Sequence, residues 1–190
     1  RAGSKGLPSK NIRKLAGRPL YEQAIRTGLR GDLRSIILST DIPEILSKSH
    51  ESAATVVERP KRLCGDQTVM EDVLKELIST RMLHDCFIIL LQPTSPLRKA
   101  IDVRRALSQY DSSNVDLVMT VSEFESDVLK CGLLENGIYS PIRNINDVFS
   151  NRQELPKVYK PNGAVFAFSA NWFMQAGGFK PASIGAVVME

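Results

Sequence analysis

The sequence CFIILLQPTSPLR, residues 86–98, combines the most apolar short run of the chain with a proline-containing turn. Such a run, bounded by turn signals, is typical of a strand buried on both faces. Prolines fix the backbone where this strand ends. Polar side chains surround the bend: Gln92, Thr94, Ser95 and Arg98. Two interpretations stay open here, a ligand site at the end of a strand or an ordinary strand-to-helix connection in which Thr94 or Ser95 caps the helix.

Outward from this stretch, apolar runs of strand length alternate with segments of helical spacing. The predicted strands are residues 35–39, 55–60, 86–91, 116–121, 164–169 and 183–190. The predicted helices are residues 17–31, 42–49, 69–79, 100–110 and 170–178. We expect Gly31 to end the first helix. This alternation predicts an α/β fold, a three-layer α/β/α sandwich around a mainly parallel, Rossmann-like nucleotide-binding sheet.

The alternation stops between residues 122 and 161, where the segments are short and polar. Asn136 and Gly137 in this stretch are typical of a type I′ hairpin turn. We therefore expect an inserted, protruding arm at 122–161 within a single domain spanning residues 1–190.

Composition indicates one folded domain and excludes several chemistries. The 190 residues are 43% hydrophobic and 24% charged, and the net charge of +4 is spread along the chain instead of concentrated in one tract. Three cysteines without CxxC spacing fit reduced thiols. His50 and His84 lack neighbouring ligands at zinc spacing. With no apolar stretch of membrane-spanning length, we expect a cytoplasmic protein.

The opening loop, RAGSKGLPSKN at residues 1–11, has the residue types of a phosphate site. Glycines let backbone N–H groups approach an anion, and Arg1, Lys5 and Lys10 can neutralise a leaving pyrophosphate. The loop matches neither the Walker pattern nor GxGxxG. A solvated basic loop remains the alternative.

Two further positions are ambiguous from the residues alone. The stretch RQELPKVYKPNGAVF, residues 152–166, mixes basic and aromatic side chains, which suits a carboxylate with a sugar ring or a nucleic acid. A plain turn at Asn162 and Gly163 would explain it equally. Asp41, after the predicted strand at 35–39, could contact a metal or a ribose, or could cap a helix.

In their order, these motifs resemble the acylneuraminate cytidylyltransferases of bacterial type, the CMP-N-acetylneuraminate synthetases. The family's opening R-x-x-S-K-G-x-x-x-K-N is found here at residues 1–11, its STD at 39–41 and its Arg-Pro pair at 59–60. LQPTSPLR at 91–98 and R-Q-x-L-P-x-x-x-[RK]-P-N-G-A at 152–164 follow. The resemblance covers nearly the whole chain and implies transfer of CMP from CTP to the anomeric hydroxyl of a sialic acid, with release of pyrophosphate.

The resemblance also implies roles for single residues. The catalytic, triphosphate-holding residues would be Arg1, Lys5 and Lys10, and the nucleotide site would add Ser4, Asn11 and Arg59. The sugar site would contain Gln92, Arg152 and Phe166, the last standing where the family often has tyrosine. Similar proteins are homodimers whose arms exchange, so Lys130 and Lys160 of the partner subunit would complete the sugar site.

Two features of the family are missing from this sequence. Similar proteins carry a D-x-D pair for Mg²⁺ just beyond the segment that ends here at Glu190, and a strand before the opening loop. We therefore expect a natural chain that continues past both ends, with Mg²⁺ as cofactor and Asp41 as a minor candidate ligand. Other readings are a cytidylyltransferase for legionaminate, pseudaminate or another 3-deoxy acid sugar, and a non-catalytic nucleotide- or RNA-binding domain. CTP and a nine-carbon sugar acid are the expected partners, with no nucleic acid and no membrane.

Overall fold

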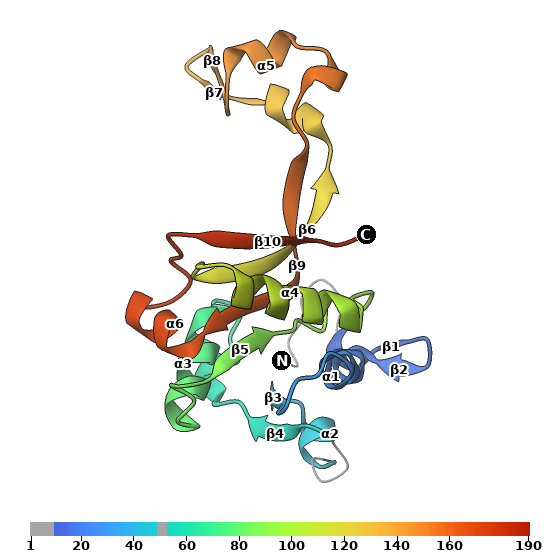
Figure 1. Ribbon diagram of the computed structural model, residues 1–190. Helices are drawn as coiled ribbons and strands as arrows, with labels where there is room; N and C mark the ends of the chain where they lie inside the picture. The colour runs from blue at the N-terminus through green and yellow to red at the C-terminus, as the bar shows by residue number, and fades with distance from the viewer. Residues whose placement is uncertain (1–9, 49–52) are drawn as a thin grey trace. The chain divides into compact units, whose positions relative to one another are not determined.

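The computed structural model describes residues 10–48 and 53–190, and their contacts separate two compact units (Figure 1). The first unit comprises Arg1–Thr120 and Gly163–Val187. The second comprises Val121–Asn162 and Val188–Glu190. The arm was predicted at residues 122–161, and its role in dimerisation stays a prediction.

The first unit alternates strands and helices as the apolar pattern predicts. Its first elements are η1 (Lys10–Ile12), β1 (Lys14–Leu15), β2 (Arg18–Pro19), α1 (Leu20–Arg30), β3 (Ile37–Thr40), α2 (Pro43–Leu46) and β4 (Thr55–Glu58). They are followed by η3 (Lys61–Leu63), α3 (Met70–Thr80), β5 (Phe87–Leu90), α4 (Ala100–Ser112), α6 (Ala170–Ala176) and β10 (Ile184–Val188). Strands β6 (Leu117–Phe124) and β9 (Val158–Ser169) run from one unit into the other.

The main sheet is mixed, which corrects the expectation of a mainly parallel sheet. Strands β3 and β4 are parallel, but the four-stranded sheet has the order β10-β6-β9-β5 and its β9 is antiparallel to β5, with Leu90 opposite Phe166. The connection between β6 and β9 explains the mixed sheet. Parallel neighbours need a crossover, usually through a helix, whereas β6 leads into the second unit and β9 leads back out of it without such a crossover.

The core of the first unit lies where α3 and α6 pack on the four-stranded sheet. Its buried members are Leu74, Ile78, Leu117, Phe168, Ala170 and Phe173. The Phe168 ring lies 5.3 Å from that of Phe173 and 5.2 Å from that of Phe179, centroid to centroid. Burying each large side chain of this kind contributes roughly 1.5–3 kcal/mol. This cluster fixes β9, the strand that carries Phe166.

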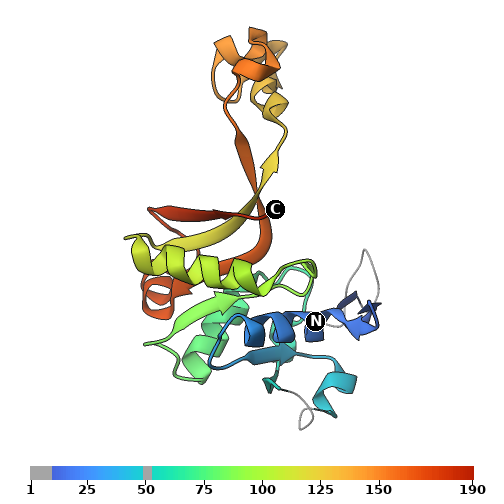
Figure 2. The ribbon, with the colours of Figure 1, turned by 45° about the vertical axis from the view of Figure 1, so that its right-hand side comes forward.

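Helix α1 packs beside α4, as the two views of the ribbon agree (Figure 2). A Cβ on Gly31 would lie 2.8 Å from the Cβ of Val103, which is closer than real contacts allow. Gly31 ends the helix as predicted, and because its φ is −92°, close packing and not a left-handed conformation explains glycine there. The predicted helix also began too early. Gly17 and Arg18 belong to the hairpin of β1 and β2, in which Ala16 and Gly17 both have positive φ.

The second unit contains a hairpin and short helices. Its elements besides the ends of β6 and β9 are η4 (Ser126–Lys130), β7 (Gly132–Glu135), β8 (Ile138–Pro141), α5 (Ile145–Phe149) and η5 (Arg152–Glu154). The turn between β7 and β8 has φ of 51° at Asn136 and 79° at Gly137. Both values are positive, as the predicted type I′ turn requires.

Candidate active site

A cavity of about 1180 Å³ lies within the first unit and is lined by β3, β5, α1 and α3. Four of the predicted site residues line it: Lys10, Asn11, Arg59 and Gln92. Most of the wall is apolar, formed by residues such as Ile36, Leu38, Ile88 and Leu90. The structure therefore brings the opening loop's last residues, the Arg-Pro pair and the start of the proline turn to one place.

Strand pairing positions Arg59 at this cavity. Its backbone N–H donates to the carbonyl of Thr40 at 2.7 Å, which continues the ladder of the parallel pair β3 and β4. Its side chain donates from Nε to Ser39 Oγ at 3.3 Å and from Nη2 to the Ser39 carbonyl at 3.0 Å. The carboxyl ends of parallel strands meet at one edge, so Arg59 is held against the STD segment at a typical ligand-binding edge. We had assigned Ser39 no role from the sequence.

Asp41 is not a helix cap. The N-cap of α2 is Ile42, whose N–H donates to Thr40 Oγ1 at 3.1 Å. Asp41 instead forms a hydrogen bond with Cys64, whose thiol also lies 3.3 Å from the Pro60 carbonyl. Burial raises the pKa of Cys64 most, and the charge and hydrogen bond of Asp41 raise it further.

The described residues do not form a metal site. Among residues 10–48 and 53–190, no three His, Cys, Asp or Glu side chains come together as ligands. At nucleotide sites Mg²⁺ is commonly held by one or two carboxylates together with substrate phosphates and waters. Asp41, which lies beside the Cys64 thiol, therefore stays a minor candidate ligand, and Mg²⁺ stays a prediction.

The proline turn is a tight structure of its own and not a helix cap. The carbonyl of Gln92 accepts a hydrogen bond from the Ser95 N–H at 3.2 Å, and the carbonyl of Ser95 accepts from the Arg98 N–H at 3.4 Å. Helix α4 starts after this turn, with Lys99 as its N-cap. The Lys99 N–H donates to Asp102 Oδ2 at 2.7 Å. Neither Thr94 nor Ser95 caps the helix, so the predicted cap was wrong, although the stretch does connect β5 to α4 as the alternative interpretation expected.

Gln92 faces the Pro-Asn-Gly segment. A Cβ on Gly163 would stand 3.5 Å from Gln92 Oε1, and Gly163 has a φ of +70°. Phe166 follows on the same strand, opposite Leu90, with its ring 6.0 Å from that of Phe179. Its ring packs on the hydrophobic core, so its contact with a sugar stays a prediction.

The remaining predicted residues lie elsewhere. Arg152 is exposed in η5, and the Lys130 carbonyl accepts a hydrogen bond from the Tyr139 hydroxyl. Lys160 Nζ lies 5.3 Å from the centroid of the Phe124 ring, a cation–π contact. All three belong to the second unit. Arg1, Ser4 and Lys5 lie outside the described residues.

Comparison with known proteins places the chain among relatives. The sequence model of the family described as "Cytidylyltransferase" matches residues 1–166. The chain belongs to this cytidylyltransferase family. It is 35% identical over 183 residues to an N-acylneuraminate cytidylyltransferase of Streptococcus agalactiae serotype III (strain NEM316), covering 94% of this chain and 44% of that protein. It is 28% identical over 187 residues to a CMP-N,N'-diacetyllegionaminic acid synthase of Legionella pneumophila, covering 94% of this chain and 79% of the relative.

Solved structures support the fold. The chain matches a CMP:2-keto-3-deoxy-manno-octonic acid synthetase complexed with CTP with a TM-score of 0.70 at 15% identity, over 99% of this chain and 87% of that one. At this identity the likeness shows the α/β fold alone. The chain spans less than half the length of the streptococcal relative. In the part that the structure describes, no helix is both long and apolar enough to cross a bilayer.

Proposed function

We propose that this chain carries the nucleotide- and sugar-binding part of an enzyme that transfers CMP from CTP to the anomeric hydroxyl of a nine-carbon α-keto acid sugar. The supporting observation is that Lys10, Asn11, Arg59 and Gln92 line one cavity in a chain of the cytidylyltransferase family. The relatives named above include enzymes named for a sialic acid and for a legionaminic acid. A pseudaminic acid cytidylyltransferase of Campylobacter jejuni is 27% identical over 190 residues, so the exact sugar stays open within this class.

The residues divide into two roles in this proposal. Arg59, held by Ser39, binds and orients CTP together with Asn11, while Lys10 neutralises the triphosphate with Arg1, Ser4 and Lys5 from the opening loop. Gln92, Phe166 and Arg152 bind the sugar acid. Phosphoryl transfer needs positioning and neutralisation of charge more than covalent help, which suits these side chains.

We propose Mg²⁺ as the cofactor. Mg²⁺ would supply charge neutralisation on the phosphates. Its proposed ligands are the carboxylate pair that the family resemblance implies, with Asp41 as a minor candidate, and we assign the ion no step. A three-layer arrangement and a cytoplasmic location belong to the same proposal.

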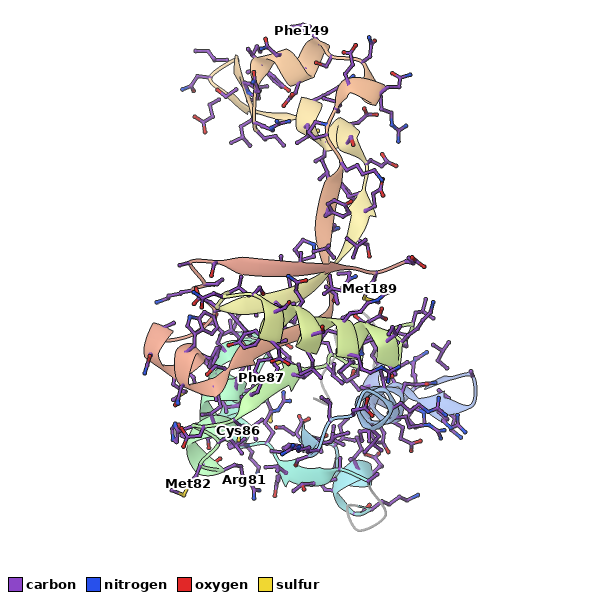
Figure 3. All side chains as sticks on the ribbon, in the orientation of Figure 1. Arg81, Met82, Cys86, Phe87, Phe149 and Met189 are labelled. Atoms are coloured by element: carbon purple, nitrogen blue, oxygen red, sulfur yellow. The ribbon has the colours of Figure 1, made fainter. Side chains whose placement is uncertain are left out.

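We also propose a homodimer formed through the second unit. Large apolar side chains of this unit are exposed: Leu133, Leu134, Ile138, Ile142, Ile145 and Phe149. Figure 3 labels Phe149, the most exposed of them, on α5. Exposed apolar side chains gathered in one unit favour an interaction surface. In this dimer, Lys130 and Lys160 of the partner subunit would lie at the sugar site. Light scattering should give twice the chain mass. A catalytically active monomer at high dilution would refute the dimer.

We further propose that chain upstream of Arg1 adds a β-strand to the cavity. Among the described residues, β3 pairs only with β4 and β5 only with β9, so each leaves one edge open, and both strands line the same largely apolar cavity. An open edge presents unpaired N–H and C=O groups, which a strand satisfies.

Nucleotide binding tests the proposed function. Titration with CTP, UTP and ATP should show preferential binding of CTP, and Arg59→Met should weaken CTP binding about 10- to 100-fold, as expected for loss of a charged hydrogen-bonding group. Arg62→Met is the matched control, because Arg62 is exposed and pairs with Glu76 at 2.5 Å. Equal affinity for the three nucleotides, or an unchanged affinity in Arg59→Met, would refute the proposed nucleotide site.

A further inference from the structure

We propose that Arg98 is a positioning residue, which ties the turn carrying Gln92 to the Gly163–Ala164 segment of β9 and so sets the geometry of the sugar-acid site. This inference rests on the proposed function. Arg98 belongs to the LQPTSPLR stretch, and from the sequence we expected it only to be a polar side chain at the bend.

The contacts of Arg98 join two segments far apart in the sequence. Its Nη1 donates to the Gln92 carbonyl at 3.2 Å and to the Ala164 carbonyl, 66 residues away. One nitrogen carries two N–H groups, so a single guanidinium end serves both carbonyls. Gln92 and Gly163 also approach each other directly, because only 3.5 Å separates Gln92 Oε1 from the position of a Cβ on Gly163.

Stability alone does not explain an arginine at this position. Arg98 is only 5% exposed, and its Nε is buried with no hydrogen-bond partner among the described residues. Burial lowers the pKa of Arg98 to about 10, although the charge of Asp102 opposes this shift. The side chain therefore stays charged at neutral pH in a site that disfavours charge. A buried charge with an unsatisfied N–H costs stability, and an apolar side chain of similar size is often at least as stable.

The surroundings of Arg98 hold it in one orientation. Asp102, itself 4% exposed, is the charged group that acts on it, and Asp102 is fixed by the Lys99 N–H at the start of α4. The guanidinium thus joins the proline turn to β9 by hydrogen bonds and interacts electrostatically with Asp102 of α4. Because a displacement of about 1 Å in a substrate-positioning group can reduce activity 100-fold, this link has a direct consequence for Gln92.

Steady-state kinetics of Arg98→Met and Arg98→Lys test the inference. Arg98→Met should raise KM for the sugar acid about 10- to 100-fold and leave KM for CTP within about threefold, since Arg59 and Ser39 lie on other strands. Arg98→Lys keeps the charge and should recover part of this loss. Arg104→Met is the matched control, because Arg104 lies in the following helix, α4, and donates to the Arg30 carbonyl at the surface. It should leave both KM values unchanged.

A second readout needs no turnover. In ¹⁵N-labelled protein, Arg98→Met should shift the Gln92 side-chain amide and the Gly163 backbone amide, and leave Gly177 in place. If the wild-type protein makes no CMP-sugar but these shifts occur, the proposed function fails and the positioning role stands. Unshifted Gln92 and Gly163 signals, or an equal rise in both KM values, would overturn the inference.

Discussion

At the scale of single residues, Gly163 connects backbone conformation with the site. Its φ of +70° is left-handed, and Gln92 Oε1 lies near the space that a Cβ would take. The sequence predicted a turn at Asn162 and Gly163 as one option, and Gly163 instead continues a twelve-residue strand, β9. Nothing in the letters PNGA shows that Gln92, 71 positions earlier, stands opposite, because such proximity depends on which strands pair.

Replacing Gly163 by alanine should separate the effect of its left-handed backbone on stability from the effect of its contact with Gln92 on the site. Left-handed backbone costs an L-residue roughly 1–2 kcal/mol, so Gly163→Ala should lower the free energy of unfolding by about 1 kcal/mol in urea titrations. Gly177→Ala is the control, because Gly177 has a φ of +71° and nothing within 4 Å of its Cβ position. Both variants should lose similar stability, but only Gly163→Ala should raise KM for the sugar acid. Equal KM effects in the two variants would contradict the account.

Cys64 gives a pH-dependent prediction. The thiolate is the reactive form, and a raised pKa moves its appearance to higher pH. Iodoacetamide labelling followed by mass spectrometry at pH 7–10 should therefore show Cys64 reacting more slowly than the exposed Cys131. Asp41→Asn should speed the labelling of Cys64, since the Asp41 carboxylate raises its pKa by charge and hydrogen bonding. An unchanged rate in Asp41→Asn would show that Asp41 does not act on the thiol.

At the scale of elements, periodicity predicted which segments form strands and helices but not how the strands pair. The runs at 86–91 and 116–121 correspond to β5 and β6, and the helix at 69–79 to α3. The insertion of β9 between β5 and β6 was missed, because strand order depends on long-range pairing and not on local pattern. The short hairpin of β1 and β2 was missed because two-residue strands carry no alternation.

Thr120 is a buried polar residue at the contact of β6 with β9. Its Oγ1 accepts from the Val165 N–H at 2.9 Å. Thr120→Val should leave this buried N–H without an acceptor and lower the free energy of unfolding by about 1–3 kcal/mol in urea titrations. The same substitution at Thr27 is the control, because the Thr27 hydroxyl only donates to the Gln23 carbonyl within α1. If Thr27→Val costs as much, the Thr120 hydrogen bond has no special role.

At the scale of the whole molecule, the cavity between β3 and β5 has two proposed roles. Its polar residues Lys10, Asn11, Arg59 and Gln92 form the proposed site, and its apolar wall and open edges accept a strand. The sequence alone indicated the first role through motifs. The cavity itself could be found only from the structure, because it depends on the space between two sheets.

Cys86 can report on the proposed strand. It is exposed, lines the cavity and stands just before Phe87 at the start of β5, as Figure 3 shows. Extending the chain upstream of Arg1 by an apolar strand should slow labelling of Cys86 at least tenfold, because a neighbouring strand removes its accessibility. Labelling of Cys131, in the second unit, is the internal control. An extension containing proline at its centre should not protect Cys86, and equal labelling with both extensions would refute a strand in the cavity.

The product that the protein forms from CTP tests the proposed CMP transfer most directly. Mass spectrometry should detect a CMP-sugar and an equal amount of pyrophosphate when CTP and Mg²⁺ are combined with N-acetylneuraminate, N,N′-diacetyllegionaminate or pseudaminate. We expect CMP transfer to at least one of these nine-carbon acids. Transfer only to an eight-carbon 3-deoxy acid, or no CTP-dependent product with any acid, would contradict it.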